Sequence, residues 1–371
     1  MPLQRKSSTM TTPSTSLGFL HSAQLVPQMP EEALVGKVAL VVPTYQAGVV
    51  WSDFIQAVKT QVGVDLQVWV VDSNSSDETV FLAQTAGWNT WTLGAQPFNH
   101  GGTRQWAVEH VGDGVELVVF MTQDALLATP DALSQLLRAF ADPQVGVVYG
   151  RQLPHVNASL LAARARFFNY PETGFVNTFE DRERLGLRAA FCSDSFAAYR
   201  LTHFKSVGGF PKHVIMGEDM WVAAKMLMAG FKVAYAAEAL VYHSHNYGLR
   251  EEFQRYFDTG VFHAQAPWLI ETFGSVKSEG LKMLKSQLLG SDDNNNGNWT
   301  KPTVGMVQDF EQCRFDDQLK KIRSSRIERW CYFLEVLSRM ATKLVGYRLG
   351  RAYSYLPRWV ITRCSSFENY W

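Results

Sequence analysis

Asp124 is the side chain in this sequence that is best placed to bind a cation. It follows the apolar run Val118 to Met121, whose β-branched and aromatic residues are typical of a buried strand in a parallel sheet. Open α/β sheets bind ligands at the carboxyl ends of their strands, and a carboxylate there can hold a divalent cation that holds a diphosphate in turn. Asp124 alone does not decide between this interpretation and a structural one, in which the aspartate caps the next turn or helix.

Glu218 and Asp219 form a second acidic site at the start of a predicted helix that runs to Ala229, with Gly230 as its C-cap. Acidic residues in a first turn complement the helix dipole, which is a purely structural role. The chemical alternative is a general base beside a metal-bound diphosphate, because a sugar hydroxyl needs a carboxylate to take its proton as it attacks.

His243 and His245 flank Ser244 just after a predicted strand at 232–237. In an extended chain, residues i and i+2 point to the same side, so both rings can face one site. Imidazole is a reasonable ligand for Mn²⁺ and a poorer one for Mg²⁺. The alternative is a pair of hydrogen-bonded surface histidines.

Three further side chains have both a chemical and a structural interpretation. Arg104 follows two glycines and could meet a phosphate at a helix N-terminus, or it could be a solvated arginine in a first turn. Tyr45 and Trp51 could stack on a base or belong to the core, and the core is the favoured place for Trp51.

The elements that position these residues alternate between strand and helix. The predicted strands are 37–42, which Pro43 ends, and 66–71, 90–93, 118–121 and 145–149. This alternation predicts a parallel sheet with helices on both faces, and the strand ends bring Thr44, Asp72 and Asp124 to one edge. The sequence has no G-x-G-x-x-G after the first strand and no G-x-x-x-x-G-K-[ST], which argues against a dinucleotide cofactor and a P-loop.

The pattern changes after residue 155. We expect helices at 160–169, 204–210 and 216–229, an irregular segment at 170–188, and a strand at 191–200 that passes under the site. Residues 249–290 and 318–349 are predicted to be helical, with a solvated loop at 291–299 between them. The predicted organisation is a flexible tail at 1–35, a catalytic domain at 36–265 and a C-terminal helical region at 266–371.

Composition excludes several classes of function. Lys+Arg and Asp+Glu number 35 each, so no overall basic field would recruit nucleic acid. The four cysteines have neither metal-type nor redox-type spacing, which suits a reducing cytosol. The first residues lack the apolar core of a signal peptide, and no run of about 18 apolar residues would span a membrane.

The ordered set of motifs resembles a known family. Val41-Val42-Pro43-Thr44-Tyr45, Val70 to Asp77, Gln123-Asp124 and Gly217-Glu218-Asp219 resemble the inverting nucleotide-sugar glycosyltransferases of family 2, which have the GT-A fold. Phe98 to Arg104, Thr122 to Ala125 and His243 to Tyr247 are similar to the bacterial rhamnosyltransferases of that family, which build O-antigen and other surface polysaccharides from dTDP-L-rhamnose. The resemblance covers about residues 37 to 265. It implies an α/β fold of the GT-A type, with a Rossmann-like, mostly parallel sheet and an added C-terminal helical region.

The resemblance also implies roles for individual residues. Asp219 would be the general base, with Glu218 orienting it or the acceptor. Thr122 replaces the first aspartate of the D-x-D-type metal motif, so Asp124 would be its one carboxylate, and a histidine, His243 by preference or His245, would complete a site for Mg²⁺ or Mn²⁺. The donor-binding residues would be Pro43, Thr44, Tyr45, Asp72, Ser73, Asn74, Ser75, His100, Gly101, Arg104, Gln123 and Asp124.

The expected activity is transfer of L-rhamnose from dTDP-β-L-rhamnose, with inversion, to a sugar hydroxyl of a glycan or a lipid-linked glycan in the cytoplasm. Two alternatives stay open: another donor, such as a UDP-hexose or UDP-N-acetylhexosamine, and a binding module without catalysis. Arg348, Arg351, Arg358 and Arg363 stand among aromatic and aliphatic residues near the C-terminus. These C-terminal helices could lie on the inner face of the membrane, or pack on the catalytic domain or on a second copy of the chain.

Overall fold

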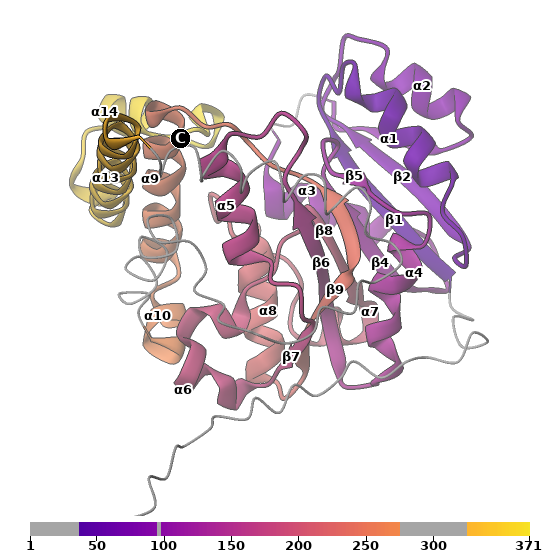
Figure 1. Ribbon diagram of the computed structural model, residues 1–371. Coiled ribbons are helices and arrows are strands. Elements are labelled where there is room, and N and C mark those ends of the chain that lie inside the picture. The colour runs from indigo at the N-terminus through magenta and orange to yellow at the C-terminus, as the bar shows by residue number, and fades with distance from the viewer. Residues whose placement is uncertain (1–36, 95–97, 275–324) are drawn as a thin grey trace, which may run out of the picture.

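The computed structural model describes residues 37–94, 98–274 and 325–371. Its strands are β1 Lys37–Thr44, β2 Leu66–Asp72, β3 Asn89–Thr92, β4 Val115–Met121, β5 Leu126–Leu127, β6 Val145–Leu153, β7 Phe175–Asn177, β8 Phe196–Arg200 and β9 Lys232–Tyr242. They form one sheet in the order β3-β2-β1-β4-β8-β6-β9-β5, and β7 pairs with β9 outside this path (Figure 1).

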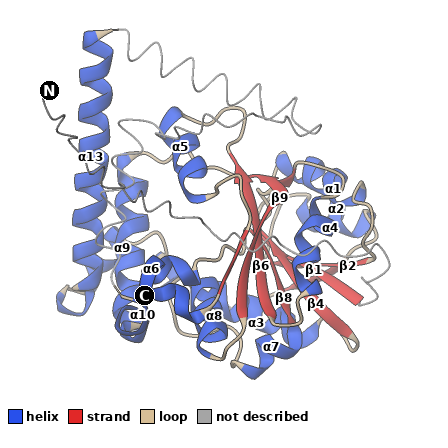
Figure 2. Ribbon diagram, turned by 60° about the horizontal axis from the view of Figure 1, so that its bottom comes forward, coloured by secondary structure: helices blue, strands red, loops and turns tan. Residues whose placement is uncertain are grey.

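Helices cover both faces of this sheet (Figure 2). The described helices are α1 Val50–Lys59, α2 Thr79–Thr85, α3 His100–His110, α4 Ala132–Leu137, α5 Leu160–Asn169, α6 Arg182–Leu185, α7 Leu201–Ser206, α8 Glu218–Met228, α9 Leu249–Gln265, α10 Pro267–Phe273, α13 Arg326–Arg351 and α14 Arg358–Cys364. No described helix is both long enough and apolar enough to cross a bilayer.

Side chains of the central strands point alternately to the two faces of the sheet, and they contribute to a separate hydrophobic core on each face. In β1, Val41 belongs to the core under α3 and α8, whereas Leu40 belongs to the core under α1 and α4. Successive side chains of a strand point to opposite faces, so a strand buried on both sides must be apolar throughout. Trp51 is completely buried in the second core, and its indole N–H donates to the carbonyl of Thr79 at 2.9 Å. The core interpretation of Trp51 is therefore confirmed.

The five strands predicted first run in one direction, as expected, but β8 is antiparallel to both β4 and β6, between which it lies. The predicted strand at 191–200 was too long at its start. The backbone N–H of Phe196 donates to the carbonyl of Ser193 at 3.1 Å, so a turn precedes β8 and leaves Asp194 beyond the sheet edge.

Other strands are longer than predicted, among them β1 and β9. β1 continues through Pro43 to Thr44. It pairs with β2 as far as Thr44, whereas its pairing with β4 ends at Val41. A proline is tolerated where its missing N–H is not needed by a second neighbour. β9 continues to Tyr242 after an irregularity in its pairing with β6. This extension brings His243 to the sheet edge that carries Asp124.

The helical region after residue 249 is divided at Ala266. α9 ends at Gln265, and Pro267 starts α10 in a first turn, where a proline without an N–H fits. α13 lies beside α9 in both views (Figures 1 and 2). A Cβ on Gly350 would lie 1.9 Å from the carbonyl oxygen of Phe257, so this close crossing requires glycine. The predicted tail, the loop at 291–299, and the predicted helical residues 275–290 and 318–324 lie outside the described residues.

Candidate active site

One cavity of about 550 Å³ opens between the carboxyl edge of the sheet and helices α5, α8, α9 and α13. It collects residues that the sequence places more than 100 positions apart. Of the predicted site residues, those that line it are His100, Arg104, Asp124, Glu218, Asp219, His243 and His245. The predicted metal and base residues therefore share one space.

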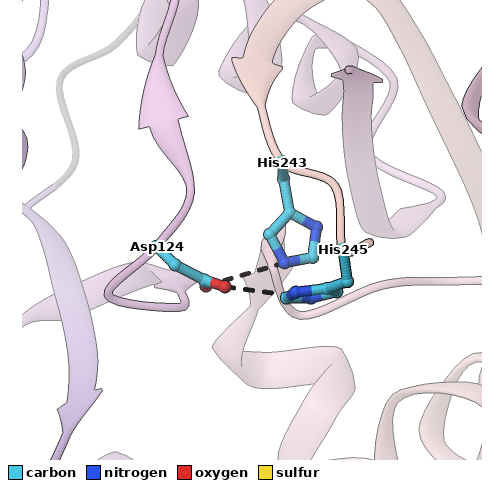
Figure 3. Close-up of side chains that lie close together, drawn as sticks. All are labelled: Asp124, His243 and His245. Atoms are coloured by element: carbon cyan, nitrogen blue, oxygen red, sulfur yellow. Dashed lines mark ion pairs between the residues drawn. The ribbon is translucent and has the colours of Figure 1, made fainter. Parts of the chain in front are cut away.

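Asp124, His243 and His245 face one another in this cavity and form what we call its metal end (Figure 3). His243 Nε2 lies 3.6 Å from Asp124 Oδ1, and His245 Nε2 lies 3.8 Å from Asp124 Oδ2. One potential ligand atom from each residue falls within 4.8 Å of the others. Both histidines face Asp124, and the preference for His243 over His245 as the metal ligand stays a prediction. The alternation of side chains after β9 accounts for this arrangement.

Gln152, at the end of β6, orients the ring of His243. His243 Nδ1 lies 2.9 Å from Gln152 Oε1, and an amide oxygen can only accept, so Nδ1 donates this hydrogen bond and Nε2 is the ring atom that faces Asp124. Gln152 is held in turn because its amide N–H donates to Ser193 Oγ at 3.0 Å. Such outer contacts orient metal-binding imidazoles in many proteins.

The electrostatics of this end suit a cation. Although burial by itself favours the neutral acid, contacts with His243 and Thr122 hold the pKa of Asp124 below its usual range. Burial, together with the neighbouring His243, lowers the pKa of His245 to about 4, so its ring is neutral near pH 7. One carboxylate and two imidazoles form a donor set that can hold a divalent first-row metal ion.

Asp219 lies in the same cavity, in the first turn of α8. Its Oδ1 accepts from the backbone N–H of Met220 at 2.7 Å, and its Oδ2 accepts from the backbone N–H of Asp194 at 3.3 Å. Burial and the neighbouring charge of Glu218 raise the pKa of Asp219 to about 6. A carboxylate with such a pKa is ionised at neutral pH and still holds a proton strongly enough to act as a general base.

Arg104 is the counter-ion of this acidic end. Its Nη1 donates to Glu218 Oε1 at 2.8 Å, and its Nε lies 3.3 Å from Asp194 Oδ2. All three side chains are at least nine-tenths buried. Asp194 also accepts a hydrogen bond of 2.6 Å from the hydroxyl of Tyr199. The structure therefore places Arg104 against two carboxylates of the protein, and its predicted contact with a donor phosphate stays a prediction.

Gly217 sets the direction in which Glu218 and Asp219 leave the backbone. It is the N-cap of α8 and has φ 79°, in the left-handed region that favours glycine. A Cβ at this position would lie 2.6 Å from the ring of Phe262 on α9. The Gly-Glu-Asp order in the sequence thus has a local cause, because the turn before the helix admits no side chain.

Most of the remaining predicted donor-binding residues lie at the ends of β1 and β2, outside the residues that line the cavity. Buried Asp72 accepts from Thr44 Oγ1 at 2.9 Å and from the backbone N–H of Ser75 at 2.7 Å. Tyr45 is exposed for 58% of its surface and so is available to a ligand. Pro43, Ser73 and Asn74 complete this edge, where the N–H of Ser73 donates to the carbonyl of Thr44.

Gln123 joins this edge to the metal end. The backbone N–H of Tyr45 donates to Gln123 Oε1 at 2.8 Å, and Gln123 Nε2 donates to the carbonyl of Tyr45 at 3.0 Å. Gly101 serves packing, since a Cβ there would lie 2.1 Å from the carbonyl oxygen of Pro211. Burial and the charge of Arg104 lower the pKa of His100, its neighbour, to about 3. Contact of these residues with a donor stays a prediction.

The sequence reasoning missed Gln152 and the role of Asp194. Asp194 stood in a segment that was expected to pass under the site, which was its one available signal. Gln152 lies past the predicted end of its strand at Tyr149, and β6 in fact continues to Leu153. Neither residue belongs to a sequence motif. Each contacts a side chain that is distant in the sequence: Gln152 contacts His243, and Asp194 contacts Arg104.

Comparison with known proteins agrees with this geometry. Residues 36–258 match the family model described as glycosyltransferase like family 2. The O-antigen chain rhamnosyltransferase RfbN of Salmonella typhimurium is 49% identical over 253 residues, which cover 68% of this chain and 80% of the relative. The O-antigen chain rhamnosyltransferase WbaN of Salmonella anatum is 46% identical over 250 residues, covering 67% and 79%.

A solved structure shares the fold. The mannosyltransferase PcManGT from Pyrobaculum calidifontis, in complex with GDP-Man and Mn²⁺, matches with a TM-score of 0.53 and 16% identity, and the match covers 86% of this chain and 88% of that one. This likeness confirms the predicted GT-A fold with its mostly parallel sheet and C-terminal helices. The chain is a glycosyltransferase and belongs to glycosyltransferase family 2.

Proposed function

We propose that this chain transfers L-rhamnose from dTDP-β-L-rhamnose, with inversion, to a sugar hydroxyl of an O-antigen chain or its lipid-linked precursor. The observation that carries the proposal is the 49% identity, over 253 residues, to an O-antigen chain rhamnosyltransferase. That match spans most of both chains, and the cavity adds a carboxylate suited to proton transfer beside a group of potential metal ligands.

Asp219 is the base in this proposal. Its carboxylate takes the proton of the acceptor hydroxyl while that oxygen attacks the anomeric carbon from the side opposite the departing dTDP. One displacement of this kind turns a β-linked donor into an α-linked product. The backbone N–H groups of Met220 and Asp194 hold the two carboxylate oxygens, which fixes the direction from which the proton is taken. Glu218 and Arg104 form the ion pair behind it.

Asp124, His243 and His245 would hold Mg²⁺ or Mn²⁺, and the two imidazoles favour Mn²⁺. A divalent ion bound there would supply positive charge for the diphosphate leaving group. Gln123 holds the loop of Asp124 against Tyr45, so the metal end and the proposed nucleoside end move together. Thr44, Tyr45 and Asp72 would contact the thymidine.

The donor can be tested with a panel of dTDP-rhamnose, UDP-glucose, UDP-galactose, UDP-N-acetylglucosamine and GDP-mannose, each with Mg²⁺, Mn²⁺ or EDTA. Hydrolysis of the donor in the absence of acceptor reports selectivity without knowledge of the acceptor. We expect selective, metal-dependent use of dTDP-rhamnose. Preference for a UDP or GDP sugar would discard the rhamnosyl donor, and absence of binding to any donor would support a binding module without catalysis.

A further inference from the structure

We infer that the outward face of α13 docks this protein on an anionic phospholipid bilayer. The outward face is defined by Ile327, Trp330, Leu334, Leu337, Leu344 and Val345. These side chains are exposed for between 38% and 76% of their surface. Their spacing of three, four and seven residues places them on one side of a helix, over five turns.

The opposite side of α13 packs against α9 and holds the helix to the rest of the protein. Val336, Gly346 and Gly350 are buried there, and a Cβ on Gly346 would lie 2.6 Å from the carbonyl oxygen of Phe253 on α9. Figures 1 and 2 both place α9 between α13 and the sheet. The outward face is therefore not needed for packing against the described residues, and a monomer rarely exposes so long an apolar stripe without a partner.

Charge identifies the partner as an anionic surface. Within residues 325–371, exposed arginines outnumber exposed glutamates by six to two: Arg326, Arg329, Arg348, Arg351, Arg358 and Arg363 against Glu335 and Glu368. A basic helix with tryptophan and leucine on its apolar face is typical of interfacial membrane binding. A second copy would present the same arginines and repel the first, so the charge disfavours self-association through this face.

The exposed aromatic residues continue past the end of α13. Tyr355 and Trp359 are exposed for 88% and 67% of their surface, and Trp359 belongs to α14. Amphipathic rings of this kind partition to the boundary between headgroups and acyl chains. Tyr355 and Trp359 thus add exposed aromatic surface on a short second segment that carries Arg358 and Arg363.

The docking would bring the cavity to the membrane. Arg339 and Lys343, on the inward side of α13, line the cavity beside Glu252, which lies 3.3 Å and 3.4 Å from their nitrogens. One helix thus forms a wall of the cavity and, on its other side, the proposed contact with lipid. This consequence rests on the proposed function, because it concerns a lipid-linked acceptor; the docking itself does not.

The test is sedimentation of the full chain with vesicles, without donor or acceptor. One set contains phosphatidylcholine alone and the other contains phosphatidylcholine with phosphatidylglycerol. We expect binding to the anionic vesicles that weakens with salt. The double variant Trp330→Glu/Leu334→Glu should lower the partition coefficient by about tenfold or more. The matched control Val62→Glu/Phe81→Glu also replaces two exposed apolar residues, far from α13, and should bind as the wild type does.

Three results would overturn the inference. The first is equal or absent binding to both kinds of vesicle. The second is a wild-type oligomer that the α13 double variant, but not the control, converts to monomers, which would make the face an interface between copies. The third is a lower melting temperature for the α13 double variant alone, which would show that another segment of the chain covers the face. Donor hydrolysis should be unchanged in both double variants, so loss of vesicle binding is distinguishable from a failure of the proposed function.

Discussion

The two ends of the cavity shift the pKa of an aspartate in opposite directions. At the metal end, Asp124 is flanked by two histidines, and the pKa of Asp124 lies below its usual range. At the base end, Asp219 lies beside Glu218, and its pKa is raised to about 6. An aspartate thus favours its charged form at the metal end and takes up a proton more readily at the base end, because the neighbouring side chains differ.

The counter-ions explain this difference. The base end has its cation built in, since Arg104 contacts both Glu218 and Asp194. Among the described residues, the ion-pair contacts of Asp124 are with imidazoles, and the lowered pKa of His245 keeps one of them neutral at pH 7. A cation is therefore accommodated best at the metal end, while a proton is accommodated best on Asp219. This is the division of roles that transfer onto a hydroxyl needs.

The sharpest way to break this comparison is Asp219→Asn. The amide keeps the shape of the side chain but cannot take a proton, so kcat should fall by roughly 10² to 10⁴-fold. Donor and metal affinity should change little, because Asp219 is not one of the potential metal ligands. Rates of transfer and calorimetric donor binding measure the two effects. Near-normal turnover would show that another group is the base.

The next largest effect is expected from Arg104→Met. Removing the guanidinium leaves Glu218 and Asp194 buried without their cation, which should lower the free energy of unfolding by about 3–5 kcal/mol near pH 8. The loss should be smaller at pH 5, because carboxylates without the cation take up protons in the folded state. Denaturant unfolding at both pH values measures this. An equal loss at both would mean that packing of Arg104, rather than its charge, matters.

How much of this site is predictable from the sequence depends on the distance over which each residue acts. Asp124, Asp219 and the two histidines follow or precede regular elements, so their place at one edge could be predicted. Asp194 and Gln152 act through Arg104 and His243, and such pairings depend on the antiparallel insertion of β8 and the extra length of β6. Periodicity indicates that an element exists, whereas its neighbour in the sheet is decided by packing.

Gln152→Leu sharpens the comparison at the metal end. Leucine fills the space of Gln152 but cannot accept the Nδ1–H of His243, so the ring loses the hydrogen bond that orients it. Metal affinity should fall by about 10–100-fold, with kcat recovered at saturating metal. Titration of Mn²⁺ against transfer rate separates the two quantities. If kcat stays low at saturation, Gln152 contacts the substrate rather than orienting the ligand.

The smallest effect is expected in the pH dependence of kcat/KM, for the variant Glu218→Gln compared with Asp219→Asn. In the wild type, kcat/KM should rise tenfold per pH unit below about pH 6 and level off above it, because the base must be deprotonated. The charge of Glu218 contributes to the raised pKa of Asp219, so neutralising Glu218 should move this rising part of the profile to lower pH. Arg104 remains in place and, free of Glu218, favours the ionised form of its neighbours further. Glu218→Gln should therefore retain most of the plateau rate while Asp219→Asn does not, and an unshifted rise would mean that the rise reports a group other than Asp219.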